Sequence, residues 1–314
     1  MTEQAQLDLD CRVAGWKAAM RSLPDSPARY LVVIRADYSL KEDGSLEPCG
    51  ESADIPLCDR WAGPDESPFP DKVGELLPEK TGREIYWLGE VMPGDIRLGV
   101  DAGDGQHLEK RVTVTKARHW KKGWLGKEPK ESADTAAPVP LSWAESFGGI
   151  CPVSQSPHPL NPSGRGFRTK GGPEAGELLP RIYSTEKVWR RPFESPEADN
   201  LAPIPEAWRD QWVGPDEPGC APPDQRLQGH WEAGDQVTLS RPDTSGIERE
   251  ITFTLPEFSP RAVLAGSAGA NRIHGCWDTV IVHSSDTAMK ISFLWRAQFD
   301  RIQSARPEWI VVDQ

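Results

Sequence analysis

The sequence lacks the long apolar run that a membrane-spanning helix requires. None of its apolar stretches approaches the ~18 residues needed for a span, and the longest, residues 30–34, has the length of a β-strand. The first ten residues, MTEQAQLDLD, are acidic and have no apolar core, so they do not form a secretory signal. We therefore expect a cytoplasmic protein that does not enter a membrane.

Recognisable catalytic and metal-binding motifs are also missing. The six cysteines form no Cys-x-x-Cys pair, and the chain has neither a Gly-Lys-Ser/Thr phosphate loop nor a Gly-x-Ser-x-Gly elbow. The acidic turn at residues 101–105 lacks the closing glutamate of a calcium loop, which favours a plain turn. His274, Cys276 and His283 would be splayed apart by strand spacing. The sequence thus predicts no metal, no cofactor and no enzymatic activity.

Basic residues are outnumbered, 36 against 48 acidic ones, which gives a net charge of −12. This balance disfavours a nucleic-acid surface, because phosphates require basic patches, and it suits a basic protein partner. The only basic run is residues 116–130, in which Trp120 and Trp124 are interleaved. A nucleic-acid patch is one interpretation of this run, but a solvated loop or a partner-facing edge fits so acidic a chain better.

Tryptophan, proline and glycine are abundant. The chain has 13 Trp, 30 Pro and 28 Gly beside only 4 Tyr and 4 Met. So much Pro and Gly excludes a helical bundle, whereas the aromatic content argues against disorder. The combination predicts long, ordered loops held by large side chains.

Alternating apolar and polar residues predict a mostly β protein with antiparallel, sandwich-like sheets, a long Pro/Gly/Trp-rich irregular middle segment and few short helices. In the clearest strand, residues 289–299, Ile291 and Phe293 share one face, and Ser292 and Arg296 lie on the other. The other predicted strands are residues 30–38, 85–91, 96–100, 108–115, 236–240, 247–255 and 277–283, with hairpin turns at 42–44, 101–105, 242–246 and 284–286.

Two short segments complete this interpretation. Residues 7–20 fit either a helical stripe or a strand joined to the next one by a turn at 24–27. Residues 206–212 predict a short helix with Pro205 near its first turn. The chain divides into an N-terminal β region (1–137), a loop-rich region (138–235) and a C-terminal β region (236–314), which form one domain or more.

The loop-rich region joins backbone-fixing glycines and prolines to aromatic anchors and to side chains that can bond to backbone groups. These residues either pin the loops onto the core or form a partner-binding surface, and pinning is favoured for most of them. Asp224 and Arg226 are expected to pair with each other or to bind loop amides. The residues singled out are Trp143, Glu145, Phe147, Gly148, Gly149, Asn161, Pro162, Gly164, Arg165, Gly166, Phe167, Ala221, Pro222, Pro223, Asp224, Gln225 and Arg226.

In this order, the segments resemble a bacterial family of unknown function that is encoded beside type VI secretion spike proteins and their toxic effectors. That family shows Pro-Leu-x-Trp/Tyr-Glu-x-x-Phe-Gly-Gly, Asn-Pro-x-Gly-x-Gly-Phe, Leu-Pro, Gly-Pro-Ile-Pro before a Trp, and Ala-Pro-Pro-Asp-Gln. Two departures are a Glu145 placed one step later and a shorter stretch between Trp212 and Cys220. The matching residues are 140–149, 161–167, 179–180, 202–208 and 221–225, and the similarity spans roughly residues 28–300.

The resemblance implies a non-catalytic adaptor or chaperone that binds an effector toxin in the cytoplasm and helps to load it onto the spike protein. An immunity protein is the second interpretation, because an acidic protein can neutralise a basic toxin by tight binding. A carbohydrate-active enzyme is the third, and it requires a cleft with two facing carboxylates of raised pKa.

Overall fold

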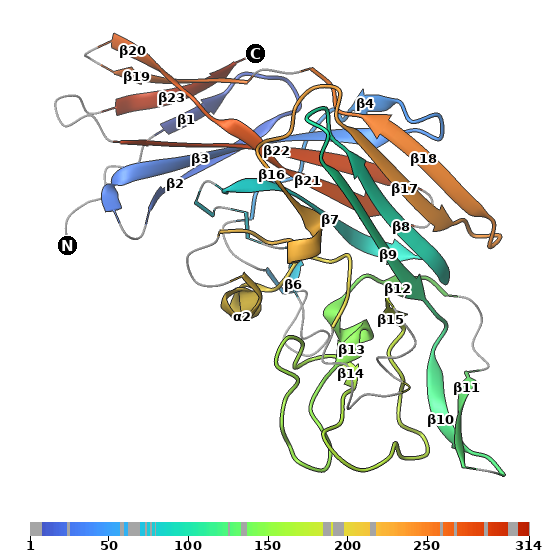
Figure 1. Ribbon diagram of the computed structural model, residues 1–314. Coiled ribbons are helices and arrows are strands. Elements are labelled where there is room, and N and C mark those ends of the chain that lie inside the picture. Colours follow the sequence, from blue (N-terminus) through green and yellow to red (C-terminus); the bar gives the residue numbers. More distant parts are fainter. Residues whose placement is uncertain are drawn as a thin grey trace.

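The computed structural model describes residues 8–23, 26–56, 60–61, 70–72, 74–75, 77–78, 80–124, 126–132, 137–184, 190, 198–213, 218–257, 260–266, 269–285, 288–300 and 307–313. These residues form a mostly β protein, as predicted, with several antiparallel sheets (Figure 1). None of the helices they form is long and apolar enough to cross a membrane.

The largest sheet has eight strands. Six of them follow the order β12-β7-β21-β22-β3-β2, while β16 pairs with β7 and β4 pairs with β3. The strands are β2 (Lys17–Leu23), β3 (Ser26–Leu40), β4 (Leu46–Pro48), β7 (Gly82–Val91), β12 (Val139–Pro140), β16 (Arg226–Gln228), β21 (Cys276–Ser284) and β22 (Met289–Asp300).

A five-stranded sheet has the order β15-β9-β8-β17-β18, and a four-stranded sheet near the two chain ends has the order β1-β23-β19-β20. The former contains β8 (Gly94–Asp101), β9 (His107–Val114), β15 (Ile182–Tyr183), β17 (Gln236–Pro242) and β18 (Glu248–Thr254). The latter contains β1 (Asp8–Cys11), β19 (Arg261–Gly266), β20 (Gly269–Ile273) and β23 (Pro307–Asp313).

The remaining elements are small. Two-stranded pairs are formed by β5 (Arg60–Trp61) with β6 (Pro70–Lys72), β10 (Arg118–Lys122) with β11 (Lys127–Glu131), and β13 (Phe147–Gly148) with β14 (Arg165–Gly166). The short helices are η1 (Trp143–Glu145), η2 (Glu206–Trp208), α2 (Arg209–Val213) and η3 (Pro223–Gln225). The helix predicted at 206–212 is thus present as η2 continued by α2.

The eight- and five-stranded sheets pack face to face and enclose the main hydrophobic core. Ile291 and Phe293 of β22 meet Leu239 of β17 and Phe253 of β18 in this core, and all four side chains are buried. The ring of Tyr38 lies 5.5 Å from that of Phe293. The sandwich-like arrangement expected from strand alternation is therefore present, and each layer mixes strands from the first and last parts of the chain.

The four predicted hairpins are present as β3–β4, β8–β9, β17–β18 and β21–β22. The helical interpretation of residues 7–20 is wrong, because Lys17–Leu23 forms a strand that pairs with β3. Residues 24 and 25 of the connecting turn lie outside the described residues. Several pairings were not predicted, among them the four-stranded sheet β1-β23-β19-β20. Residues 116–130, interpreted from sequence as a solvated loop or a partner-facing edge, contain the paired strands β10 and β11. In addition, β7 and β21, almost 200 residues apart, run parallel in the large sheet.

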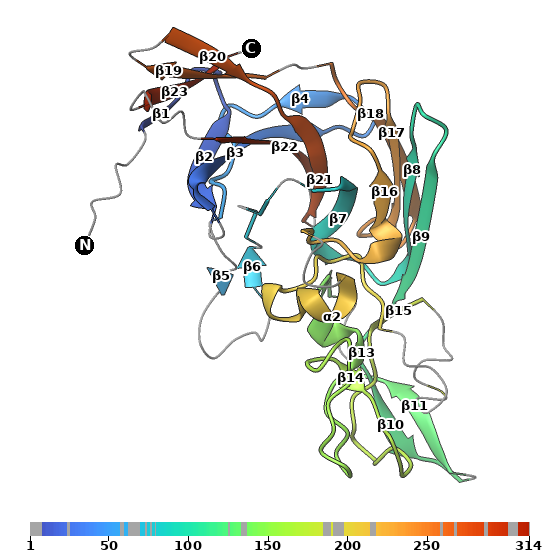
Figure 2. The same cartoon turned by 60° about the vertical axis from the view of Figure 1, so that its left-hand side comes forward.

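A lobe of long loops projects from one end of the sandwich (Figures 1 and 2). We call residues 116–132 and 137–184 the loop lobe. Two small apolar clusters stabilise it, one around Phe147, Leu179 and Tyr183, the other around Trp143. Trp143 also contacts Trp212, with ring centroids 5.0 Å apart. The described residues of the middle segment thus pack around aromatic anchors, as the composition predicts.

Candidate functional site

The large sheet carries polar side chains on the face that points away from the sandwich core. Ser292 and Arg296 alternate with the core residues of β22, and the register places Asp37 of β3 directly beside Ser292. Thr279 of β21 lies opposite Glu84 of β7. Since side chains at alternate positions share a face, four adjacent strands build one polar surface.

This polar surface is buried by residues 49–56, by the described residues 74–75, 77–78 and 80, and by residues 218–225. The amide of Ala53 donates to Asp37, at 3.0 Å. The amides of Cys220 and Ala221 donate to the Glu84 carboxylate, at 3.0 and 3.1 Å. Strand alternation correctly places Ser292 and Arg296 on the face opposite the core, but tertiary contacts bury both of them completely.

A network of fully buried charges forms the centre of this surface. The Arg296 guanidinium donates to the carboxylates of Asp278 and Glu75. The Lys80 ammonium donates to Glu75 at 3.3 Å, and also to Glu84. Burial alone would raise the pKa of Glu75, but Lys80 and Arg296 outweigh it and lower this pKa to about 2. Glu75 is therefore ionised at neutral pH.

The carboxylates of Glu75 and Glu84 and the Cys220 sulfur lie within 4.8 Å of one another, which is metal-ligand spacing. The Lys80 ammonium contacts both carboxylates and so takes the place of a cation between them. Burial and the charge of Glu75 raise the pKa of the Cys220 thiol, so it remains protonated and is a poor ligand. Nor is Glu75, with its lowered pKa, suited to donate a proton as a glycosidase acid does.

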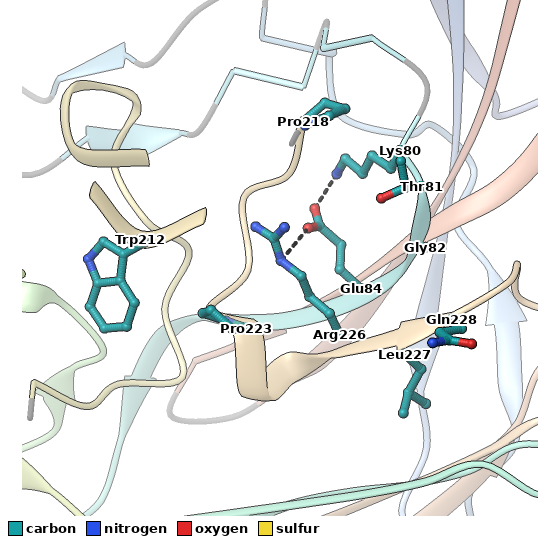
Figure 3. A pocket seen from close by; sticks show the side chains of 10 residues that line it. All are labelled: Lys80, Thr81, Gly82, Glu84, Trp212, Pro218, Pro223, Arg226, Leu227 and Gln228. Carbon is teal, nitrogen blue, oxygen red and sulfur yellow. Dashed lines mark hydrogen bonds and ion pairs between the residues drawn. The ribbon is translucent and has the colours of Figure 1, made fainter. Parts of the chain in front are cut away.

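A cavity of about 420 Å³ opens beside this network (Figure 3). Glu84 lies on its wall between Lys80 and Arg226, whose Nε is 3.9 Å from the carboxylate. Arg226 Nε also donates to the Ala221 carbonyl at 2.8 Å. The charged groups of this cavity are thus already engaged by protein atoms, which favours a structural role for them.

A second cavity, of about 440 Å³, lies over the same sheet face next to Tyr86, Ile281 and His283. His283 Nε2 lies 2.9 Å from Ser292 Oγ and 3.3 Å from an Arg35 nitrogen. Because the arginine always donates, Nε2 accepts, and the imidazole is neutral. Burial and the charge of Arg35 lower the pKa of His283 to about 3.

This lowered pKa predicts an acid-sensitive stability. A histidine in the unfolded chain has a pKa of 6.5. Below that pH the unfolded state binds a proton at His283 and the folded state does not. The free energy of unfolding therefore falls as the pH decreases toward 3. Between pH 6.5 and 5 we expect His283 to contribute a loss of about 1–2 kcal/mol. Urea denaturation at several pH values measures it.

Replacing His283 by Gln is expected to remove this pH dependence above pH 5. The matched change at His107, which is 58% exposed, should leave it intact. Equal slopes for wild type and H283Q between pH 6.5 and 5 would contradict the assignment.

The segments of the loop lobe that the sequence analysis singled out, 140–149 and 161–167, bind mostly to each other. Asn161 is fully buried, and its side-chain amide donates to the carbonyls of Trp143 and Phe147, at 2.8 and 3.0 Å. Glu145 accepts from Arg165 at 2.8 Å. Phe147 and Phe167 pack edge to face at 6.3 Å. The structure thus brings the two segments predicted from sequence, 140–149 and 161–167, together.

The glycines of these segments allow the close approach. Gly148 and Gly149 have φ values of +150° and +98°, a region that favours glycine. An added Cβ on either would overlap with the backbone of Asn161 or Gly164. The remaining residues singled out here, Pro162, Gly164 and Gly166, are half-buried.

The segment at residues 221–226 docks onto the large sheet. Gln225 is fully buried, and its amide donates to the carbonyls of Ile85 and Leu201, both at 3.0 Å. Ala221 and Pro222 are buried, whereas Pro223 is exposed.

Of the two expectations for Asp224 and Arg226, the mutual pair is not formed, whereas Arg226 does bind a loop backbone group, the Ala221 carbonyl. Asp224 is 59% exposed and accepts from Lys110 at 2.8 Å, while Arg226 faces Glu84. These partners could not be predicted from local sequence, because Lys110 and Glu84 lie on strands from other parts of the chain.

The sequence also did not predict that Glu75, Lys80 and Arg296 lie together in a cluster. The one available signal was the pair of polar positions in β22, since a charged residue within so apolar a strand requires a buried partner or water. Glu75 and Lys80 lie in a loop whose partners sequence spacing does not reveal.

Comparison with known families decides where this chain belongs. The sequence pattern of a family described as an uncharacterized protein conserved in bacteria (DUF2169) matches residues 26–215, about three fifths of the chain. The chain belongs to the DUF2169 family. The match to DUF2169 includes β3, β7 and the whole loop lobe, and it ends before the 221–226 segment and the last hairpin. No curated protein and no solved structure matches the chain.

Proposed function

We propose that this DUF2169 protein is a non-catalytic adaptor or chaperone that binds an effector toxin in the cytoplasm and helps to load it onto the spike protein of a type VI secretion system. The link to secretion comes from the order of the sequence segments, which resembles that of proteins encoded beside spikes and effectors. The proposal that the protein works by binding another protein is supported by the surface of the loop lobe.

Unpartnered apolar side chains on the loop lobe carry this proposal. Trp124, Ile150, Val153 and Leu178 are 97%, 57%, 51% and 47% exposed. Among the described residues, the only other large apolar side chain of this kind is Ile247, at 58%, on the β17–β18 turn. Exposed apolar groups that gather on one projecting part of a protein are typical of partner-binding surfaces.

The two cavities offer weaker support for a catalytic function than the loop lobe offers for a binding function. Glu84 in the wall of the first cavity is paired with Lys80 and Arg226. Arg35 in the wall of the second is paired with Asp37, and the pKa of Glu75 is lowered rather than raised. A general acid would need the opposite shift.

Co-expression tests the proposal. The full chain should co-purify with the toxin encoded by a neighbouring gene, and removing it should abolish the toxin's association with the spike protein. Changing Ile150, Val153 and Leu178 to serine should weaken the complex by roughly tenfold or more, whereas Ile247→Ser serves as the matched control. Absence of any complex with toxin or spike would overturn the adaptor.

An immunity protein is the alternative outcome of the same experiment. It would protect cells that express the toxin and would not promote association with the spike. Such protection without spike loading would replace the adaptor by the immunity protein.

A further inference from the structure

The β10–β11 hairpin of the loop lobe combines two features found nowhere else among the described residues. Its tip carries Trp124, the most exposed large apolar side chain. Residues 116–131 contain six Lys or Arg and two Glu, a net charge of +4 within a chain of −12. The rest of the chain therefore carries −16, and the hairpin is a basic projection on an acidic protein (Figure 2).

The hairpin is held rigidly on the lobe. Trp120 packs against the cluster of Phe147, Leu179 and Tyr183. The Trp120 amide donates to the Glu177 carbonyl at 2.9 Å, and the Leu179 amide donates to the Arg118 carbonyl at 2.9 Å. A binding element that is ordered before association loses less conformational entropy on binding.

The exposed lysines are not neutralised within the protein. Lys121, Lys122, Lys127 and Lys130 are exposed, and none of them forms an ion pair with a described carboxylate. Lys127 donates to a backbone carbonyl, that of Pro173, and so keeps its charge. Arg118 differs from these lysines, because its guanidinium lies over the Tyr183 ring, 5.3 Å from the ring centroid, and so makes a contact within the loop lobe. Four cations without a carboxylate partner among the described residues thus lie on the same hairpin as the exposed indole.

Protection of the β11 edge against pairing with another sheet does not by itself explain both the lysines and the exposed Trp124. Lysines and Pro129 on the outer strand β11 do discourage pairing with another sheet. However, a fully exposed Trp at the tip works against solubility, and it offers about 150–250 Å² of surface to bury. Tryptophan is also enriched among the residues that dominate binding energy at interfaces.

We infer that the β10–β11 hairpin is a docking element for an acidic protein surface, in which Trp124 enters an apolar pocket and the four lysines pair with carboxylates around its rim. This inference rests on the proposed adaptor function and names the charge of its partner. Complementary charge of this kind accelerates association and makes it sensitive to salt. A protein partner is favoured over nucleic acid because an acidic patch on a protein is local and can contact the hairpin alone, whereas a long phosphate backbone would extend past the hairpin over a chain whose remaining residues carry −16.

The test measures the affinity of the full chain for the toxin encoded by the neighbouring gene, at low and at moderate salt. Trp124→Ala should weaken binding roughly 30-fold or more. Reversal of the four lysines to glutamate should weaken it further at low salt and remove most of the salt dependence. Because all five side chains are exposed, the melting temperature should not change.

Control substitutions outside the hairpin show whether the effects depend on where the apolar and charged side chains lie. Ile247→Ala removes an exposed apolar group elsewhere, and Lys41→Glu with Arg111→Glu reverses exposed charges elsewhere. Neither should alter the affinity. Charge reversal of the toxin's acidic residues should restore binding to the lysine-reversed variant.

The outcomes distinguish the two proposals. If wild type binds the toxin and both hairpin variants bind equally well, the adaptor survives and the hairpin inference is wrong. If wild type binds no toxin and does not bind the spike, the adaptor itself fails. If a labelled 30-nucleotide DNA binds wild type and is lost on lysine reversal, the hairpin recognises phosphates, which also overturns the inference.

Discussion

Replacing Arg296 by methionine is expected to destabilise the protein by about 3–5 kcal/mol, the cost of removing one partner from a buried ion pair. Arg296 is 0% exposed and neutralises Asp278 and Glu75, which are equally inaccessible. Methionine fills a similar volume but leaves both carboxylates without their guanidinium. Urea denaturation at pH 7 measures the change in the free energy of unfolding.

Two further variants show whether charge is the cause. The double change Arg296→Met with Asp278→Leu removes one stranded carboxylate and should recover part of the lost stability, since an apolar pair can replace a buried ion pair. Arg111→Met removes a 66% exposed arginine that pairs with Glu109, and it should cost no more than about 0.5 kcal/mol. A loss below about 1 kcal/mol for Arg296→Met would show that the network contributes little.

Replacing Gly149 by alanine is expected to cost about 3–4 kcal/mol and to loosen the loop lobe. Its φ of +98° is unfavourable for alanine, and the new Cβ would overlap with the Gly164 carbonyl oxygen. The approach of the 140–149 and 161–167 segments would then be lost. Thermal melting, together with limited proteolysis of the lobe, reports both effects.

Gly176 provides the control for conformational strain alone. It lies in the same lobe with a φ of +89°, but an added Cβ would meet no atom within 4 Å. Gly176→Ala should therefore cost only about 1 kcal/mol and leave the proteolytic pattern unchanged. Equal losses at the two positions would refute the close-approach argument.

Local sequence patterns predicted the long strands of the two sandwich sheets and four hairpins, but not the four-stranded sheet or the β10–β11 hairpin. Alternation in residues 289–299 identified β22 and the faces of Ile291 and Ser292, because side-chain direction in a strand depends only on the order of residues. Turn residues identified the β8–β9 and β17–β18 hairpins for the same reason. The helical alternative for residues 7–20 remained open because both periodicities fit, and pairing with β3 decided it.

The order of motifs along the chain also placed the protein in a bacterial family without known function. These motifs located the segments that build the loop lobe, since glycine, proline and aromatic residues fix local shape. They could not show which side chains stay exposed. Trp120 and Trp124 are four residues apart in sequence, yet one packs in a cluster and the other is almost fully exposed.

Only the tertiary structure determined the buried charge network and the basic hairpin. Glu75, Lys80, Asp278 and Arg296 come from distant parts of the chain, and their proximity results from the parallel pairing of β7 with β21 and the loop that covers them. The exposure of the loop lobe likewise depends on its projection from the sandwich. The sequence by itself determined a loop-rich β protein, whereas contacts across the fold decided which charges are buried in pairs and which stay exposed on the β10–β11 hairpin.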